Sequence, residues 1–223
     1  MRTEAFLRLT DLAARRYAPA GHFARGMARG KLRNDPVYRA LLERGVAEAA
    51  SVTDLGCGRG LLLALILEAR TGPPVPMLRG IEIRSAEVHA ARAASGPETT
   101  ILHGNLADAV PPPSQIVTLV DVLHYLPAAH QDRLLERAAA ALNPGGTLFV
   151  READGGAGPG FHAVRLSERI AALVRGEGMR PFVYRPAEDW VRRLERLGLS
   201  VAVAPMGRGT PFANVLLEAR AAA

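Results

Sequence analysis

Three glycines at alternate positions follow a short apolar run in the first third of this 223-residue chain. The run and its turn read Val52-Thr53-Asp54-Leu55-Gly56-Cys57-Gly58-Arg59-Gly60, and an apolar stretch typical of a core helix begins at Leu61. Glycines where a strand turns into a helix allow a tight bend and a close approach of the backbone to a ligand. We therefore expect a ligand-binding turn here.

The spacing and charge of this turn favour a cationic ligand over a dinucleotide. The nicotinamide pattern Gly-x-Gly-x-x-Gly would place its third glycine where the chain has Leu61. Asp54 lies two residues before the first glycine, and a carboxylate there disfavours a pyrophosphate. We interpret Cys57, the single cysteine, as a small residue that fits the turn and not as a nucleophile.

Strand-like and helix-like segments alternate around this turn. Apolar, β-branched runs predict strands at residues 52–56, 77–83, 99–103, 116–122 and 147–150. Helices are expected at residues 61–70, 85–94, 127–142, 161–174 and 186–197, with Ser85 as an N-cap. Two last strands, at 199–204 and 213–218, are expected to form an antiparallel pair at the sheet edge. The pattern predicts a Rossmann-like α/β fold with a seven-stranded, mostly parallel sheet.

The glycine turn resembles a known family motif. Asp54-Leu55-Gly56-Cys57-Gly58-Arg59-Gly60 is similar to the first motif of the class I S-adenosylmethionine-dependent methyltransferases. The predicted turn Asn143-Pro144-Gly145-Gly146 also matches that family, so the resemblance covers about residues 52–152. It implies S-adenosyl-L-methionine as the cofactor and a methyl transfer as the reaction.

The resemblance also assigns the cofactor residues. A carboxylate at the end of the second strand, Glu82, can accept bonds from both ribose hydroxyls. In the family an Asp or Asn after the third strand binds adenine, and Asn105 matches it better than Asp108. Asp121, after the fourth strand, would lie near the methionyl ammonium. The expected cofactor-binding set is Asp54, Gly56, Cys57, Gly58, Gly60, Glu82, Ile83, Gly104, Asn105, Leu106, Asp121, Val122 and Leu123.

The residues after Leu123 are expected beside the methyl acceptor. His124 is the candidate general base, because an imidazole can take a proton from a phenol or another hydroxyl near neutral pH. A packing role for His124, or one in shaping the pocket, remains open. Tyr125 could line the acceptor pocket or stack on adenine. Methyltransferases that modify bases carry Asn/Asp-Pro-Pro-Tyr/Phe at this strand end, whereas this chain has Asp121-Val122-Leu123-His124. Nucleic acid is therefore disfavoured as substrate and partner.

The N-terminal 50 residues precede the first core strand and are expected to form a helical lid, with helices at 3–17 and 36–49; residues 51–223 form the methyltransferase domain. This segment holds ten Lys and Arg against five Asp and Glu, which suits either an acidic partner or a solvated helix face. Residues 23–38 (FARGMARGKLRNDPVY) and 209–215 (GTPFANV) resemble a bacterial subgroup found with aryl polyene biosynthesis.

That subgroup resemblance implies an aromatic, phenolic acid or its thioester as acceptor, and an acyl carrier protein as a possible partner. Lys31 or Arg33 would then hold the methionyl carboxylate or the acceptor's acid group, unless both are surface cations. The sequence thus predicts a cytoplasmic biosynthetic enzyme that methylates oxygen or carbon of a small molecule. Protein or RNA methylation, or cofactor binding without catalysis, are the alternatives. We expect no metal, no membrane span and no signal peptide.

Overall fold

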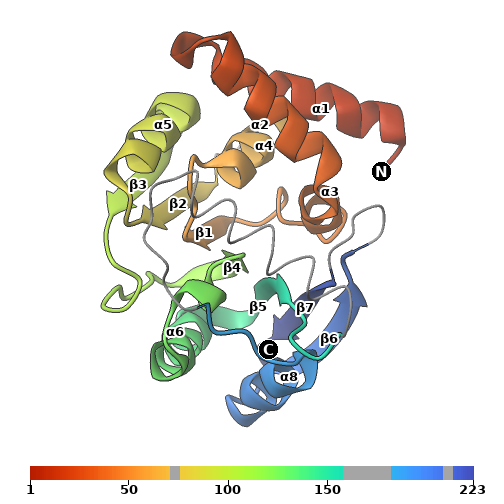
Figure 1. Cartoon of the computed structure of the whole chain (residues 1–223), viewed down its shortest axis with the longest axis vertical. Coiled ribbons are helices and arrows are strands. Elements are labelled where there is room, and N and C mark those ends of the chain that lie inside the picture. The colour runs from red at the N-terminus through yellow and green to blue at the C-terminus, as the bar shows by residue number, and fades with distance from the viewer. Residues whose placement is uncertain (71–75, 158–181, 208–212) are drawn as a thin grey trace. The chain divides into compact units, whose positions relative to one another are not determined.

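The computed structural model describes residues 1–70, 76–157, 182–207 and 213–223. Within these residues seven strands form one sheet with the order β3-β2-β1-β4-β5-β7-β6. β2 runs parallel to β1 and β3, whereas β7 runs antiparallel to β5 and β6. The predicted Rossmann-like α/β fold with an antiparallel edge pair is confirmed (Figure 1). The chain divides into two compact units, Met1–Thr118 and Leu119–Ala223, which are described in turn.

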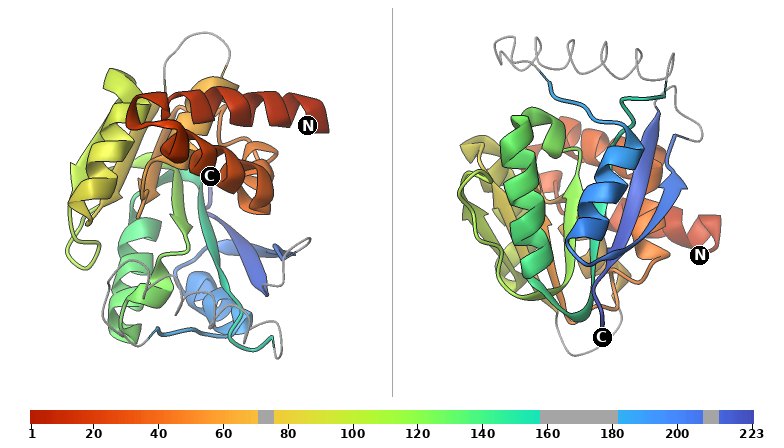
Figure 2. Two further views of the ribbon diagram at one scale, coloured as in Figure 1. Left: turned by 45° about the horizontal axis from the view of Figure 1, so that its top comes forward. Right: turned by 90° about the horizontal axis from the view of Figure 1, so that it is seen from below.

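The first unit combines parallel strands with helices that pack on them and on one another. Its strands are β1 (Ser51–Leu55), β2 (Met77–Glu82), β3 (Thr99–His103) and most of β4 (Ser114–Val120). Its helices are α1 (Thr3–Arg15), η1 (Ala18–Ala20), α2 (His22–Asn34), α3 (Pro36–Leu42), α4 (Leu61–Ala69), α5 (Ser85–Ser95) and η2 (Gly96–Glu98). α5 packs on β2 and β3, and α4 packs on α1 and α5 (Figures 1 and 2).

Burial explains why β1 and α4 are apolar without a periodic pattern. Every residue of β1 is buried, and the first six residues of α4 are buried as well. A strand or helix covered on all sides needs no polar face. Gly60 joins the two elements, and a Cβ there would lie 3.2 Å from both Ala91 Cβ and Ser95 Oγ of α5. Glycine therefore lets α5 pack closely against the turn.

The N-terminal helices differ from the sequence prediction. α1 ends at Arg15, and residues 22–34 form a separate helix that was not predicted. α3 ends at Leu42 because the chain turns through Gly45, whose φ is 82°. Asp35 caps α3, since its Oδ1 accepts a hydrogen bond from Val37 N at 3.2 Å. Ser85 is the first residue of α5 and not its cap, because Arg84 occupies the N-cap position.

The second unit places helices on the antiparallel part of the sheet. Its elements are η3 (Leu123–Tyr125), α6 (Ala128–Ala140), β5 (Leu142–Ala153), α8 (Ala187–Arg196), β6 (Ser200–Pro205) and β7 (Asn214–Arg220). α6 packs on β5, and α8 packs on β6 and β7 (Figure 2). The helix expected at 161–174 lies outside the described residues.

The turn predicted at residues 143–146 was wrong, because β5 already begins at Leu142. Gly145 N donates to Ala222 O at 2.8 Å, and Ala221 N donates to Gly146 O at 2.9 Å. Pairing with the C-terminal residues thus extends the strand through a sequence that favours a turn in isolation. Gly145 keeps a φ of 70°, which a residue without a Cβ adopts readily.

None of the helices in the described ranges is long and apolar enough to cross a membrane.

Substituting Gly80 in β2 is expected to destabilise the fold. A Cβ at this position would lie 2.6 Å from Cys57 Sγ and 2.9 Å from Ile101 Cδ1. Gly80→Ala should therefore lower the free energy of unfolding, measured in urea, by about 1–3 kcal/mol through overpacking. Gly26→Ala is the matched control, because nothing lies within 4 Å of its Cβ position on α2. It should be neutral or stabilising by up to about 1 kcal/mol, and equal effects of both changes would refute the packing argument.

Candidate active site

The glycine turn between β1 and α4 is folded against the end of β2. Ile81 O accepts hydrogen bonds from Gly56 N at 2.8 Å and from Cys57 N at 3.1 Å. Positive φ angles of 78°, 53° and 74° occur at Gly56, Gly58 and Gly60. A Cβ on Gly58 would meet only Arg84 Nη2 within 4 Å among the described residues, at 3.9 Å. The backbone at Gly58 is therefore open to a ligand.

Cys57 packs into this part of the fold through its side chain. The residue is 8% exposed, and its Sγ lies over Gly80 of β2. Burial raises the pKa of the Cys57 thiol far above its usual value, and the nearby carboxylates of Asp54 and Glu82 raise it further. A thiol that stays protonated is a poor nucleophile, which agrees with its interpretation as a small residue that fits the turn.

Glu82 at the end of β2 holds the turn in place. Its Oε2 accepts a hydrogen bond from Gly58 N at 2.9 Å, and its Oε1 accepts from Arg84 N at 2.9 Å and Arg84 Nε at 3.1 Å. A carboxylate has about four acceptor positions, and the Arg84 side chain is 45% exposed. Three protein N–H groups already occupy such positions, and the Glu82 side chain is 5% exposed. Hydrogen bonds from the ribose hydroxyls to Glu82 stay a prediction.

Asp54 brings a second buried carboxylate to the same turn. Its Oδ1 accepts a hydrogen bond from Thr118 Oγ1 at 2.7 Å. Burial raises the pKa of Asp54 to about 6, the Thr118 hydroxyl lowers it, and the charge of Glu82 raises it. No cation of the described residues contributes to this balance. The pair of carboxylates therefore forms an anionic spot that favours a positively charged ligand.

The end of β3 lies beside the end of β2, where the sequence analysis expected adenine. Gly104 N donates to Glu82 O at 3.0 Å, and His103 Nε2 lies 2.7 Å from Ile83 O. Asn105 Oδ1 accepts a hydrogen bond from Ala107 N at 3.0 Å, which shapes the turn after β3. Ile83 is 54% exposed, as an apolar contact for a flat ring would be. The adenine contacts of these residues stay predictions.

The N-terminal segment contacts the glycine turn through Tyr17, which the sequence analysis missed. Tyr17 is buried, and its Oη donates a hydrogen bond to Arg59 O at 2.7 Å. Arg59 Nε in turn lies 2.8 Å from Glu87 Oε2 of α5. A tyrosine between α1 and a short 3-10 helix carries no sequence pattern that marks such a contact.

Lys31 and Arg33, the two expected substrate contacts on α2, each have an acidic partner. Lys31 Nζ lies 3.6 Å from Asp35 Oδ2, and Arg33 Nη2 lies 2.7 Å from Asp11 Oδ2. The second pair joins α2 to α1. Their roles toward a substrate stay predictions.

In the second unit the chain bends sharply after β4. Asp121 has a φ of 57°, the single positive value among the described non-glycine residues. Its N donates to Arg151 O at 3.0 Å, and its carboxylate forms an ion pair with the Arg151 guanidinium. These contacts with β5 hold a backbone conformation that only a few residue types, including Asp, adopt.

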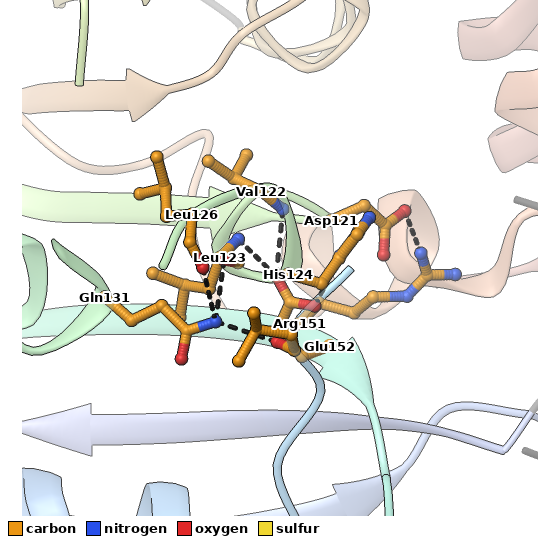
Figure 3. A network of polar contacts seen from close by, with 9 residues as sticks. Asp121, Val122, Leu123, His124, Leu126, Gln131, Arg151 and Glu152 are labelled. Carbon is orange, nitrogen blue, oxygen red and sulfur yellow. Dashed lines mark hydrogen bonds and ion pairs between the residues drawn. The ribbon is translucent and has the colours of Figure 1, made fainter. Parts of the chain in front are cut away.

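Glu152, the next residue of β5, fixes the turn that follows (Figure 3). Its Oε1 accepts hydrogen bonds from Val122 N at 2.9 Å and Leu123 N at 2.6 Å. Its Oε2 lies 2.7 Å from His124 Nδ1, and both side chains are almost fully buried. A carboxylate only accepts, so Nδ1 carries the ring proton and Nε2 is the basic nitrogen. Nε2 is itself buried, and the role of His124 as a general base stays a prediction.

Three aromatic rings surround this imidazole. Tyr184 stacks on His124 at 5.3 Å between centroids, Tyr125 lies at 4.2 Å, and Phe182 meets it edge-on at 5.8 Å. Tyr125 is 41% exposed. Together with Glu152, these side chains form the His124 cluster: Tyr125, His124, Glu152, Phe182 and Tyr184. The imidazole is thus fixed by one carboxylate and packed among aromatic rings.

The structure therefore groups the predicted residues by unit. Asp54, the glycines and Glu82 meet around one turn, while Asp121–Tyr125 form a second turn held by Glu152. In the described part of the chain no three His, Cys, Asp or Glu side chains gather as metal ligands would. Glu152 and the two aromatics at 182 and 184 were missed. The sequence holds one weak signal, the charged pair Arg151-Glu152 at the end of an apolar strand.

The chain is similar in sequence to known proteins. A family model described as a methyltransferase domain matches residues 20–203. The chain is 32% identical over 117 residues to carboxy-S-adenosyl-L-methionine synthase of Chromohalobacter salexigens, over 50% of this chain and 43% of that protein. It is 33% identical over 138 residues to trans-aconitate 2-methyltransferase of Mycobacterium tuberculosis, over 61% and 50%. The chain thus spans about half the length of the curated relatives it matches.

A solved structure supports the fold. Magnesium protoporphyrin IX methyltransferase of Synechocystis PCC 6803, with bound S-adenosylhomocysteine, superposes with a TM-score of 0.65 at 20% identity. The match covers 93% of this chain and 92% of that chain.

Replacing Asp54 by asparagine is expected to stabilise the unliganded protein at alkaline pH. The folded state raises the pKa of Asp54 from 3.8 to about 6, so it binds the proton more tightly than the unfolded chain. The contribution of Asp54 to stability is therefore fully present below about pH 4, and about 3 kcal/mol of it is lost as the pH rises through about 6. Asp54→Asn should melt several degrees higher at pH 8, and this advantage should vanish toward pH 4.

Asp108→Asn is the matched control, because it neutralises an exposed carboxylate in the turn after β3. It should leave the pH dependence of melting unchanged. A melting temperature of Asp54→Asn below that of the wild type at pH 8 would contradict the account.

Proposed function

The chain belongs to the methyltransferase-domain family, and we propose that it transfers a methyl group from S-adenosyl-L-methionine to a hydroxyl of a small aromatic acid. The observation that carries this proposal is the His124 cluster, in which Glu152 fixes an imidazole among aromatic rings. Such an imidazole can take the proton of a phenolic hydroxyl, which makes the oxygen a stronger nucleophile.

The cofactor would be held by the buried carboxylates of the first unit. Asp54 provides negative charge for the cationic methionyl part, and Glu82 accepts hydrogen bonds from the ribose hydroxyls. The open backbone at Gly58 leaves room for close approach, while Ile83 and Asn105 would contact adenine. Val122, Leu123, Gly104 and Leu106 are proposed as further lining. The cofactor supplies a methyl group on a sulfonium, which is already electrophilic.

The protein's own contribution is orientation and proton removal. Glu152 holds the Nδ1–H of His124, which leaves Nε2 to take the acceptor's proton once the acceptor reaches this buried atom. The buried carboxylate then stabilises the imidazolium that forms. The stacked ring of Tyr184 limits rotation of the imidazole. Alignment of acceptor and methyl group would supply much of the remaining rate.

The acceptor class is inferred from the cluster and the relatives. Tyr125, Phe182 and Tyr184 offer ring faces and edges for an aromatic substrate. The curated relatives include a protein named for the methylation of trans-aconitate, a small acid. The resemblance of residues 23–38 to the aryl polyene-associated subgroup also favours an aromatic acid.

The acid could be free or carried on an acyl carrier protein. Exposed cations on the N-terminal helices, Arg8 and Arg15 on α1 and Arg25 on α2, would attract such an acidic partner. We also propose that residues 1–50 act as a lid, since Tyr17 already binds the glycine turn. Lys31 or Arg33 would reach an acid group only by leaving Asp35 or Asp11.

Product mass tests the proposal directly. Purified protein is incubated with S-adenosyl-L-methionine and, separately, with free phenolic acids, the same acids on an acyl carrier protein, a protein mixture and bulk RNA. A mass gain of one methyl group on a phenolic acid, free or carried, supports the proposal. A mass gain only on RNA or protein would contradict the proposal and indicate an RNA or protein methyltransferase. No mass gain on any acceptor would indicate a protein that binds the cofactor without catalysis.

Glu82→Gln is expected to weaken cofactor binding by about 10- to 100-fold, because a neutral amide loses the charge-assisted hydrogen bonds to the ribose. Calorimetry with S-adenosylhomocysteine measures this change. Glu68→Gln is the matched control, since Glu68 lies near the far end of α4 from the turn and pairs with Arg16 at 2.6 Å. Equal affinities of both variants would remove Glu82 from the cofactor site.

His124→Gln is expected to lower kcat by about 100-fold or more, the usual contribution of a general base. In the wild type the rate should fall as acidification protonates the imidazole, and the variant should lose this dependence. Steady-state rates across pH with the acceptor found by mass provide the measurement. His89→Gln, at an exposed position on α5, is the control. Near wild-type turnover of His124→Gln at every pH would leave His124 a packing role.

A further inference from the structure

We propose that Gln131 of α6 is a positioning residue that joins the two halves of the His124 cluster. One half is the turn of residues 123–126, which carries His124 and Tyr125. The other is the segment of residues 182–186, which carries Phe182 and Tyr184. The inference rests on the proposed function, since it assigns Gln131 to the site in which His124 acts.

The hydrogen bonds of Gln131 reach both halves. Its Nε2 lies 2.9 Å from Leu123 O, 3.1 Å from Leu126 O and 2.8 Å from Val183 O, and the residue is fully buried (Figure 3). Three carbonyl oxygens around one atom require a donor, which identifies it as the amide nitrogen. Val183 N also donates to His124 O at 2.9 Å. The two halves are thus held together on both sides of Val183.

Neither half has a regular element to hold it. The turn of residues 123–125 is a single 3-10 turn, which is too short to be stable alone. Residues 182–186 belong to no helix or strand. Arg185 adds a second anchor on α6, with Nη1 2.7 Å from Asp132 Oδ1 and Nη2 2.8 Å from Ala128 O. α6 therefore acts as the common support of both segments.

The polar surroundings of this buried position explain why it holds a glutamine. An apolar side chain of the same length would fill the space but would leave the three carbonyl oxygens without this donor. Gln131 Oε1 has no hydrogen-bond partner among the described residues, which is unfavourable for a buried carbonyl. Within the described residues the amide thus keeps an oxygen without a partner and places its two N–H groups among three carbonyl oxygens. The unfavourable burial of Oε1 is explained if the amide N–H groups set the geometry of the His124 cluster.

Glu152 and Gln131 then divide the positioning of His124 between them. Glu152 sets the direction and tautomer of the imidazole from β5. Gln131 sets the distance between that imidazole and the rings of Phe182 and Tyr184. Loss of the Gln131 donor should loosen both segments together and leave the glycine turn of the first unit unchanged.

Gln131→Met, which keeps the length but removes the donor, tests the inference. Gln115→Met is the matched control, because Gln115 Oε1 accepts from Ala50 N at 2.8 Å in the other unit. The readouts are hydrogen–deuterium exchange of peptides covering residues 121–127 and 182–187, and the imidazole N–H signal of His124 in ¹⁵N-histidine NMR. That signal is assigned by its absence in His124→Gln.

In Gln131→Met both peptides should exchange about 5- to 100-fold faster, as expected when buried carbonyls lose their donor. The His124 N–H signal should shift or broaden, and calorimetry with S-adenosylhomocysteine should stay within about twofold of the wild type. The control should change none of these. If Gln131→Met does not fold, Gln131→Glu serves instead: a carboxylate repels the three carbonyls at pH 8, whereas its protonated form can donate at pH 5.

Unchanged exchange and an unchanged imidazole signal in a folded variant would overturn the inference and leave the base role of His124 intact. A lost signal in Gln131→Met combined with full turnover of His124→Gln would have the opposite meaning. Gln131 would remain a positioning residue, and His124 would lose its proposed role as the base. The two failures are therefore distinguishable.

Discussion

A buried carboxylate at the end of a strand, accepting backbone N–H groups of a turn, is the interaction on which both candidate sites depend. In the first unit Glu82 accepts hydrogen bonds from Gly58 N and Arg84 N. In the second unit Glu152 accepts hydrogen bonds from Val122 N and Leu123 N. Parallel strands end at one edge of a sheet, where turns leave backbone donors without strand partners. An ionised carboxylate satisfies several such donors at once. It also places negative charge where a cationic ligand would bind.

The candidate sites contain features that lower the stability of the folded protein but position groups for a ligand. Asp54 is buried without a cation among the described residues, and burial disfavours its charged form. Asp121 keeps a backbone conformation that non-glycine residues rarely adopt. Each feature is unfavourable for folding alone and is held by its surroundings, Thr118 in one case and Arg151 in the other. Such features concentrate at functional sites.

The sequence predicted what depends on local pattern. Strands, most helices and the glycine turn follow from apolar runs and from residues with special backbone freedom. The prediction failed where residues far apart in the sequence determine the local structure. Residues 143–146 have the sequence of a turn, but they pair with Ala221 and Ala222. The helix at 22–34 was missed because its glycines and cations weaken the apolar period.

Some residues of the candidate sites were likewise predictable from the sequence, and others were not. Asp54 and Glu82 lie near the ends of predicted strands, and His124 follows another by two residues, so the chain order places all three near the ends of strands. Glu152 lies next to the end of β5, where a charged residue is usually exposed to solvent. Gln131 lies among the polar residues at the start of α6, and no periodicity distinguishes it from a surface residue. Both became visible only through their contacts with residues 122–126 and 183.

The central claim is that two buried carboxylates prepare the glycine turn for a sulfonium compound and not for a diphosphate. Calorimetric titration of the wild-type protein with S-adenosyl-L-methionine and, separately, with NADH tests it most directly. The account predicts saturable binding of S-adenosyl-L-methionine at one site per chain and no heat of binding with NADH. Tight binding of NADH without any response to S-adenosyl-L-methionine would contradict it.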